Sequence, residues 1–145
     1  MLSGIRAVSE PDQAGSQNLS GAWTGIYTYG HDGNSVPFEA TLVEIGAALS
    51  GTIHEPCSRG GRPGEVMVAT LRGSRDGNSI HFVKTYETDK PHYGYPIAYS
   101  GGLSGDATEI AGRWAILRAP GAGTFLMIRA GGRKAAVARK ATVRA

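Results

Sequence analysis

Apolar and polar residues alternate along most of the chain, and the segment 95–117 shows this pattern most clearly. Ile110, Trp114 and Ile116 fall on one face of a strand, and the residues next to them fall on the other. A period of two is typical of a half-buried β-strand. The turn-forming cluster Ser-Gly-Asp-Ala at 104–107 separates this strand from the preceding one, so the segment predicts a β-hairpin.

The same pattern recurs along the chain. It predicts eight strands, at about 19–29, 36–45, 49–55, 66–73, 79–86, 95–103, 110–117 and 124–129. Most connections are short turns, which favour antiparallel neighbours, and closing the sheet removes its exposed edges. The predicted fold class is therefore all-β, an eight-stranded antiparallel up-and-down β-barrel. A two-sheet sandwich is the alternative.

The chain divides into three parts. The barrel domain spans 19–129, because the alternation begins and ends there. Residues 1–18 show no sustained period, so we expect a flexible N-terminal arm. Residues 130–145 form a basic C-terminal tail with no large apolar face, and we expect it to be dispensable for folding.

Charge is unevenly distributed. Six of the 15 Lys and Arg residues lie in 129–145, which contains no acidic residue. The remaining chain has nine basic and twelve acidic residues, a net charge of −3. An acidic body argues against a nucleic-acid-binding face on the domain itself.

The single cysteine, Cys57, excludes an internal disulfide and fits a reducing compartment. The first residues lack a basic region followed by a long apolar stretch, so no secretory signal is expected. No apolar run is long enough to span a bilayer. We therefore expect a cytoplasmic protein without a membrane span. The four His residues lack paired spacing, so neither a metal site nor a cofactor is expected.

Three short segments, in order, carry a resemblance. Leu19-Ser-Gly-Ala-Trp23 contains a Gly-x-Trp motif, and Ala48-Leu-Ser-Gly-Thr-Ile53 is similar to a Leu-Thr-Gly-Thr-Tyr segment. Tyr99-Ser-Gly-Gly102, followed by Ile110-Ala-Gly-Arg-Trp-Ala-Ile-Leu117, is similar to Trp-Ser-Gly and Thr-Gln-Trp-Leu-Leu strands. All three resemble the avidin-like and lipocalin-like barrels of the calycin group.

The resemblance implies a barrel that encloses a compact apolar molecule. It also implies that an Arg of the last strand, here Arg129, packs over the Trp of the first strand, here Trp23, as a cation–π pair. The alternative is a solvated Arg at the start of the basic tail. Avidins enclose biotin with several Trp residues and a first-strand polar group. This chain has two Trp residues, and Gly25 occupies the polar position, so biotin is not the expected ligand.

Aromatic residues recur on the faces predicted to point into the barrel. The predicted ligand-binding residues are Tyr27, Tyr29, Phe38, Phe82, Lys84, Tyr86, Tyr95, Tyr99 and Trp114. Tyrosine walls suit a ligand with rings and a few polar atoms. The alternative is tyrosines at the barrel rims with their hydroxyls in water, and tryptophans that only close the core. The longer connections, 56–64 and 87–93, mark the expected open end.

Four residues are candidates for acid–base chemistry: Lys84, Tyr86, His54 and Glu55. Lys84 alternates with Phe82 and Tyr86. Facing inward it would be a desolvated amine with a lowered pKa, whereas a bulge would turn it outward. His54 and Glu55 are neighbours on one strand, so only one of them faces in.

Three functions follow. The first is a barrel that binds a small, largely apolar ligand in its interior. The second is a cofactor-free lyase, isomerase or cyclase that acts on a lipophilic substrate. The third is an interaction module whose basic tail engages an acidic partner, and a homo-oligomer is compatible with each. An ionisable residue beside the tyrosines inside the cavity would separate the first two.

Overall fold

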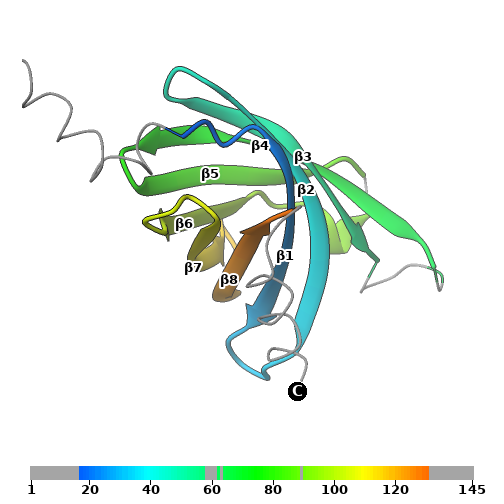
Figure 1. Ribbon diagram of the computed structural model, residues 1–145. Helices are drawn as coiled ribbons and strands as arrows, with labels where there is room; N and C mark the ends of the chain where they lie inside the picture. The colour runs from blue at the N-terminus through cyan, green and yellow to red at the C-terminus, as the bar shows by residue number, and fades with distance from the viewer. Residues whose placement is uncertain (1–16, 58–61, 63, 89, 131–145) are drawn as a thin grey trace, which may run out of the picture.

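The computed structural model describes residues 17–57, 62, 64–88 and 90–130 of the chain. Eight antiparallel strands close into one barrel in chain order (Figure 1). They are β1 (Gly21–Tyr29), β2 (Ser35–Ile45), β3 (Ala48–Pro56), β4 (Val66–Asp76), β5 (Ser79–Tyr86), β6 (Ile97–Leu103), β7 (Glu109–Ile116) and β8 (Ala122–Arg129). A single 3₁₀ turn, η1 (Pro91–Tyr93), lies between β5 and β6. The predicted up-and-down barrel is confirmed, and the sandwich alternative is wrong because β8 pairs with β1.

Several strand boundaries differ from the sequence prediction by one to three residues, and two of these differences have a clear cause. β4 continues to Asp76 because Arg75 still pairs with Ile80, and Gly77, at a φ of 63°, makes the turn into β5. β6 begins at Ile97 rather than at residue 95. The 3₁₀ turn and Pro96, which has no N–H to donate, delay the start of pairing with β5.

The predicted alternation is visible in burial. Val36, Phe38, Ala40 and Leu42 of β2 are buried, and the residues between them are exposed. The two ends of the barrel differ. At the end where β1 begins, which we call the closed end, short turns join β2 to β3, β4 to β5 and β6 to β7. At the other end, the open end, lie the β1–β2, β3–β4, β5–β6 and β7–β8 connections.

Large side chains fill the middle of the barrel. A Cβ atom on Gly25 would lie 2.2 Å from Cζ of Phe38, so the missing side chain of this glycine makes room for the Phe38 ring. Across the barrel the rings of Phe82 and Tyr99 stack with centroids 4.8 Å apart, and Phe125 meets Tyr99 edge-on. Tyr99 also borders a cavity that lies toward the open end.

Trp23 and Arg129 seal the closed end. The Trp23 side chain is fully buried, and its indole N–H donates to the Leu19 carbonyl at 3.0 Å. The Arg129 guanidinium lies 5.4 Å from the Trp23 ring centroid and donates to the carbonyls of Asn18 and Ser20. The cation–π pair expected from the resemblance is therefore present, and the solvated alternative is wrong.

A second contact that sequence patterns did not indicate holds the same segment. Glu44 accepts a hydrogen bond from the Leu19 N–H at 2.8 Å and an ion-pair contact from Arg75 at 3.0 Å. Arg75 also donates to the Gln17 carbonyl at 2.7 Å. Residues 17 and 18 of the expected arm are thus attached to the barrel. The rest of the arm, 1–16, and the tail from 131 onward lie outside the described residues.

Replacing Arg129 with Ala should destabilise the barrel. The change removes the cation–π contact and two hydrogen bonds, which together contribute about 1–3 kcal/mol. Urea denaturation of the variant should show the midpoint lowered accordingly. Arg113→Ala, on the exposed face of β7, is the matched control and should shift the free energy of unfolding by less than about 0.5 kcal/mol. Equal midpoints for the two variants would show that Arg129 contributes nothing to closure.

Candidate ligand-binding site

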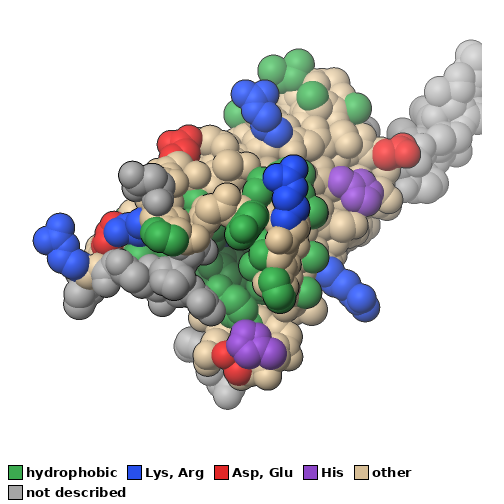
Figure 2. Space-filling model, turned by 180° about the vertical axis from the view of Figure 1, so that it is seen from behind, with side chains coloured by type: hydrophobic (Ala, Val, Ile, Leu, Met, Phe, Trp, Pro, Cys, Tyr) green, Lys and Arg blue, Asp and Glu red, His purple; other side chains and the backbone are tan. Residues whose placement is uncertain are grey.

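A cavity of about 170 Å³ lies at the open end of the barrel. Five of the six tyrosines of the chain line it: Tyr27, Tyr29, Tyr86, Tyr93 and Tyr99. The remaining lining residues are His31, Ile97, Trp114, Ile116, Pro120 and Gly121. Figure 2 shows a hollow, lined by apolar side chains, on one face of the molecule. The cavity thus lies at the end that the longer predicted loops marked.

The predicted ligand-binding residues separate into three groups. Tyr27, Tyr29, Tyr86, Tyr99 and Trp114 line the cavity. A second group lies inside the barrel without lining the cavity, and consists of Phe38, Phe82 and Lys84. The third group is Tyr95 alone.

The predicted inward position of Tyr95 is wrong. Its side chain is 50% exposed, because residue 95 precedes β6 and the alternation of that strand does not reach it. Tyr93, from the 3₁₀ turn, takes the place at the cavity wall, with its ring 4.6 Å from that of Tyr86. Sequence patterns missed Tyr93 because a period of two does not apply to a loop. The only signal was an aromatic residue two positions after Pro91 in the connection between β5 and β6.

A buried polar cluster lies beside this cavity. Glu55 on β3 accepts hydrogen bonds from Lys84 at 2.6 Å, Tyr27 at 2.7 Å and Tyr86 at 2.8 Å. Lys84 bonds one carboxylate oxygen, and the two hydroxyls share the other. The cluster therefore joins β1, β3 and β5 across the barrel interior. We call these four residues the Glu55 cluster.

Electrostatics favour one protonation pattern for the two tyrosines. Burial, followed by the neighbouring Tyr86 and Glu55, raises the pKa of Tyr27 far above its ordinary value. Burial and then the Glu55 charge raise the pKa of Tyr86 in the same way. Both hydroxyls therefore stay protonated and donate to the carboxylate. Both hydroxyl donors are therefore used within the cluster.

Lys84 is fully buried, so the inward orientation is the observed one and the bulge alternative is wrong. Burial lowers its pKa, and the Glu55 carboxylate opposes that shift. Its ammonium lies 4.6 Å from the ring centroids of both Tyr27 and Tyr86. The charge is thus balanced by one carboxylate and two aromatic faces. Neither Lys84 nor Glu55 lines the cavity, because tyrosine rings separate them from it.

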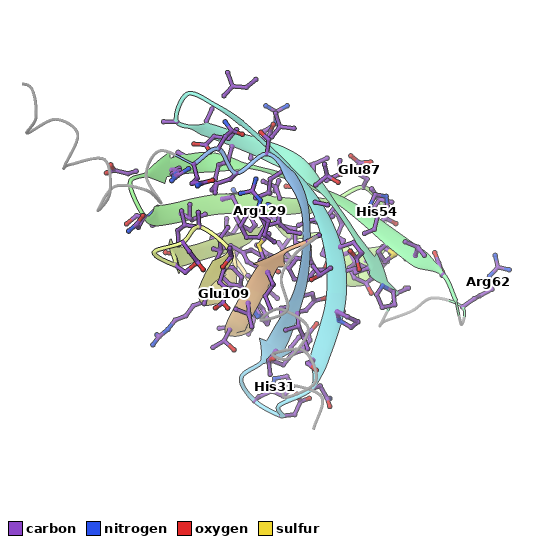
Figure 3. The ribbon with its side chains drawn as sticks, in the orientation of Figure 1. His31, His54, Arg62, Glu87, Glu109 and Arg129 are labelled. Atoms are coloured by element: carbon purple, nitrogen blue, oxygen red, sulfur yellow. The ribbon has the colours of Figure 1, made fainter. Side chains whose placement is uncertain are left out.

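The four acid–base candidates do not all meet. Lys84, Tyr86 and Glu55 come together in the cluster, whereas His54 is exposed on the outer side of β3 (Figure 3). Cys57 is half-buried, with its sulfur 3.6 Å from the Tyr93 hydroxyl. His54 and Cys57 therefore do not form a nucleophile–base pair.

Two kinds of feature are absent from the described residues. No group of three or more His, Cys, Asp and Glu side chains gathers there in an arrangement that would hold a metal ion. In the same part of the chain, no helix has the length and apolar character needed to cross a membrane.

Comparisons with known proteins supply no relative. No protein-family model matches the chain, and a search of curated proteins returned no match. The candidate site therefore depends on the geometry of the cavity and of the Glu55 cluster.

Removing one partner of the buried Lys84–Glu55 ion pair should destabilise the barrel more than replacing both partners. Lys84→Met leaves an uncompensated carboxylate in the core and should destabilise the barrel by about 3–5 kcal/mol. Adding Glu55→Gln removes that charge and keeps an acceptor for the tyrosine hydroxyls. The double variant should recover most of the lost stability in urea denaturation. Equal loss in the single and double variants would contradict a role for the unpaired charge.

Alkaline pH should unfold the barrel through its tyrosines. The pKa values of Tyr27, Tyr86 and Tyr99 are raised, mainly by burial, so the folded state keeps protons that the unfolded chain loses above about pH 10. Their contribution is intact below that pH and declines above it, by up to about 4 kcal/mol per pH unit. The pKa of Lys84 is lowered, so its effect on the free energy of unfolding is the opposite one, an increase with pH. That increase occurs only below about pH 10.4.

Urea denaturation at pH 9, 10 and 11 measures this slope. Tyr99→Phe should reduce the slope above pH 10 by about a third, while the exposed Tyr95→Phe should leave it unchanged. A free energy of unfolding that does not fall between pH 10 and 11 would contradict the assignment.

Proposed function

We propose that this protein binds one compact, largely apolar ring-containing molecule in the cavity at the open end of the barrel. The observation that carries the proposal is a cavity of about 170 Å³, lined by five tyrosines, beside a core of buried apolar side chains. A packed interior leaves few voids larger than a water molecule, so an aromatic-lined space of this size is a candidate binding site.

The dimensions of the cavity limit the ligand. An apolar cavity of roughly 150 Å³ accommodates a benzene ring, so about 170 Å³ holds a ring with a small substituent. Trp23 and Arg129 seal the opposite end, and Phe38 fills the space that Gly25 leaves. A ligand therefore enters at the open end and stops at the middle of the barrel.

The second candidate is a cofactor-free barrel enzyme, and the observation that favours it is the buried Lys84–Glu55 pair. The tyrosine hydroxyls of the cluster connect the cavity wall to Glu55 and would carry a proton between them. Both ionisable groups are bonded to each other behind that wall, however. Ligand binding does not require Lys84 or Glu55 to leave its partner, so binding is the better-supported function.

Blocking the cavity tests the first candidate. Ile116 lines the cavity, so Ile116→Trp should occupy part of it and weaken binding of the one-ring probe toluene at least tenfold. Leu117→Trp adds the same side chain to the next residue, which is exposed and outside the cavity, and should leave the affinity within about twofold. Titration calorimetry with toluene measures both variants.

Two results would contradict the proposal. One is the absence of probe binding by the unaltered protein. The other is an equal affinity for both Trp variants, provided that each unfolds at the temperature of the unaltered barrel, since the probe would then bind elsewhere on the surface.

A further inference from the structure

One buried polar group at the cavity wall is not used by the barrel itself. The Tyr99 side chain is 3% exposed, and no described residue forms a hydrogen bond with its hydroxyl. Its ring is held by the stack on Phe82 and the edge contact with Phe125, with centroid distances of 4.8 and 4.9 Å. A buried hydroxyl without a hydrogen-bond partner costs about 1–3 kcal/mol. Tyr99 is therefore a buried donor, held in place by its ring contacts, that has no acceptor among the described residues.

Tyr99 is one of the residues that line the cavity, and Tyr29 is another. A tyrosine hydroxyl keeps its proton at neutral pH and is therefore a donor there. Burial, followed by Glu55 and then by Tyr29, raises the pKa of Tyr99 further, so the donor persists at alkaline pH. A ligand in the cavity would meet that donor.

Four other donors at the wall have partners within the protein. Tyr27 and Tyr86 donate to Glu55, and the Trp114 indole N–H donates to the Thr28 carbonyl at 3.2 Å. Tyr93 has its hydroxyl beside the Cys57 sulfur. Tyr99 thus differs from these neighbours in having its donor available to a ligand.

The charges around the cavity favour a neutral ligand. Lys84 and Glu55 neutralise each other in a 2.6 Å contact. An anion near Tyr99 would be repelled by Glu55 and would find the Lys84 ammonium already bonded. A cation would approach the Tyr27 and Tyr86 rings, against which the Lys84 ammonium already lies. Burying either charge without a free counter-charge is unfavourable.

We propose that the cavity recognises a neutral one-ring compound bearing a hydrogen-bond acceptor oxygen, and that the Tyr99 hydroxyl donates to that oxygen. This inference rests on the proposed function and names the ligand class for the same site. The ring packs among the tyrosines and Trp114, where edge-to-face contacts are available, and the oxygen accepts from the Tyr99 hydroxyl. Aldehydes, ketones and ethers on a six-membered ring belong to this class.

Four compounds of similar size test the inference with the full-length protein in titration calorimetry. Acetophenone has the ring and the acceptor, ethylbenzene lacks the acceptor, benzoate is an anion and benzylammonium is a cation. Acetophenone should bind at least fivefold more tightly than ethylbenzene and tenfold more tightly than either ion. Tighter binding of ethylbenzene, or of either ion, would overturn the inference.

Tyr99→Phe isolates the hydroxyl, because it keeps the ring that packs on Phe82 and Phe125. It should weaken acetophenone binding about three- to tenfold, the value of one neutral hydrogen bond, and change ethylbenzene affinity less than twofold. Tyr95→Phe, outside the cavity, is the matched control and should change neither. An equal effect of Tyr99→Phe on both compounds would overturn the role of the hydroxyl.

The outcome also separates this inference from the proposed function. If toluene binds and Ile116→Trp blocks it, but acetophenone binds no more tightly than ethylbenzene, the ligand class is wrong and the binding function stands. If neither toluene nor any of the four compounds binds, both are wrong.

Discussion

The structure depends on the hydrogen-bonded ladder between β1 and β8, which joins the first strand to the last. Seven residue pairs form it, from Trp23 opposite Arg129 to Tyr29 opposite Gly123. Closure gives every strand an inner and an outer face, and a shift of one residue would exchange them. The Arg129–Trp23 contact lies at one end of this ladder, so it seals the closed end and marks the register.

Closure also creates a narrow interior that the chain fills unequally. Aliphatic and aromatic side chains pack the closed end and the middle, where Gly25 admits the Phe38 ring. Toward the open end, the hydrogen bonds of the Glu55 cluster take the place of apolar contacts. Burying an ion pair costs desolvation free energy, which the three hydrogen bonds and two aromatic faces offset. Because these bonds need set distances, they hold β1, β3 and β5 at fixed separations around the cavity.

The same cluster determines the chemistry of the cavity wall. By drawing the hydroxyls of Tyr27 and Tyr86 toward Glu55, it leaves ring surfaces for a ligand to contact. Tyr99 lies outside this hydrogen-bonded group, since no described residue accepts its proton. A largely apolar wall that includes the Tyr99 donor is a selective arrangement, because a ligand without an acceptor leaves that donor unsatisfied. The proposed ligand class follows from this division between engaged and open hydroxyls.

The sequence by itself determined the eight strands, their antiparallel order and most inward-facing residues, because alternation and turn residues are local properties of the chain. It also indicated Lys84, Glu55 and four of the five lining tyrosines as candidates. Only the tertiary structure decided that Lys84 pairs with Glu55, since the two lie 29 residues apart and meet only through barrel closure. It likewise exchanged Tyr95 for Tyr93, because the position of a loop residue depends on how the connection packs across the barrel end. The tertiary structure also decided which tyrosine hydroxyls form hydrogen bonds within the protein. Those bonds depend on distances between strands, and the distances are set only when the barrel closes.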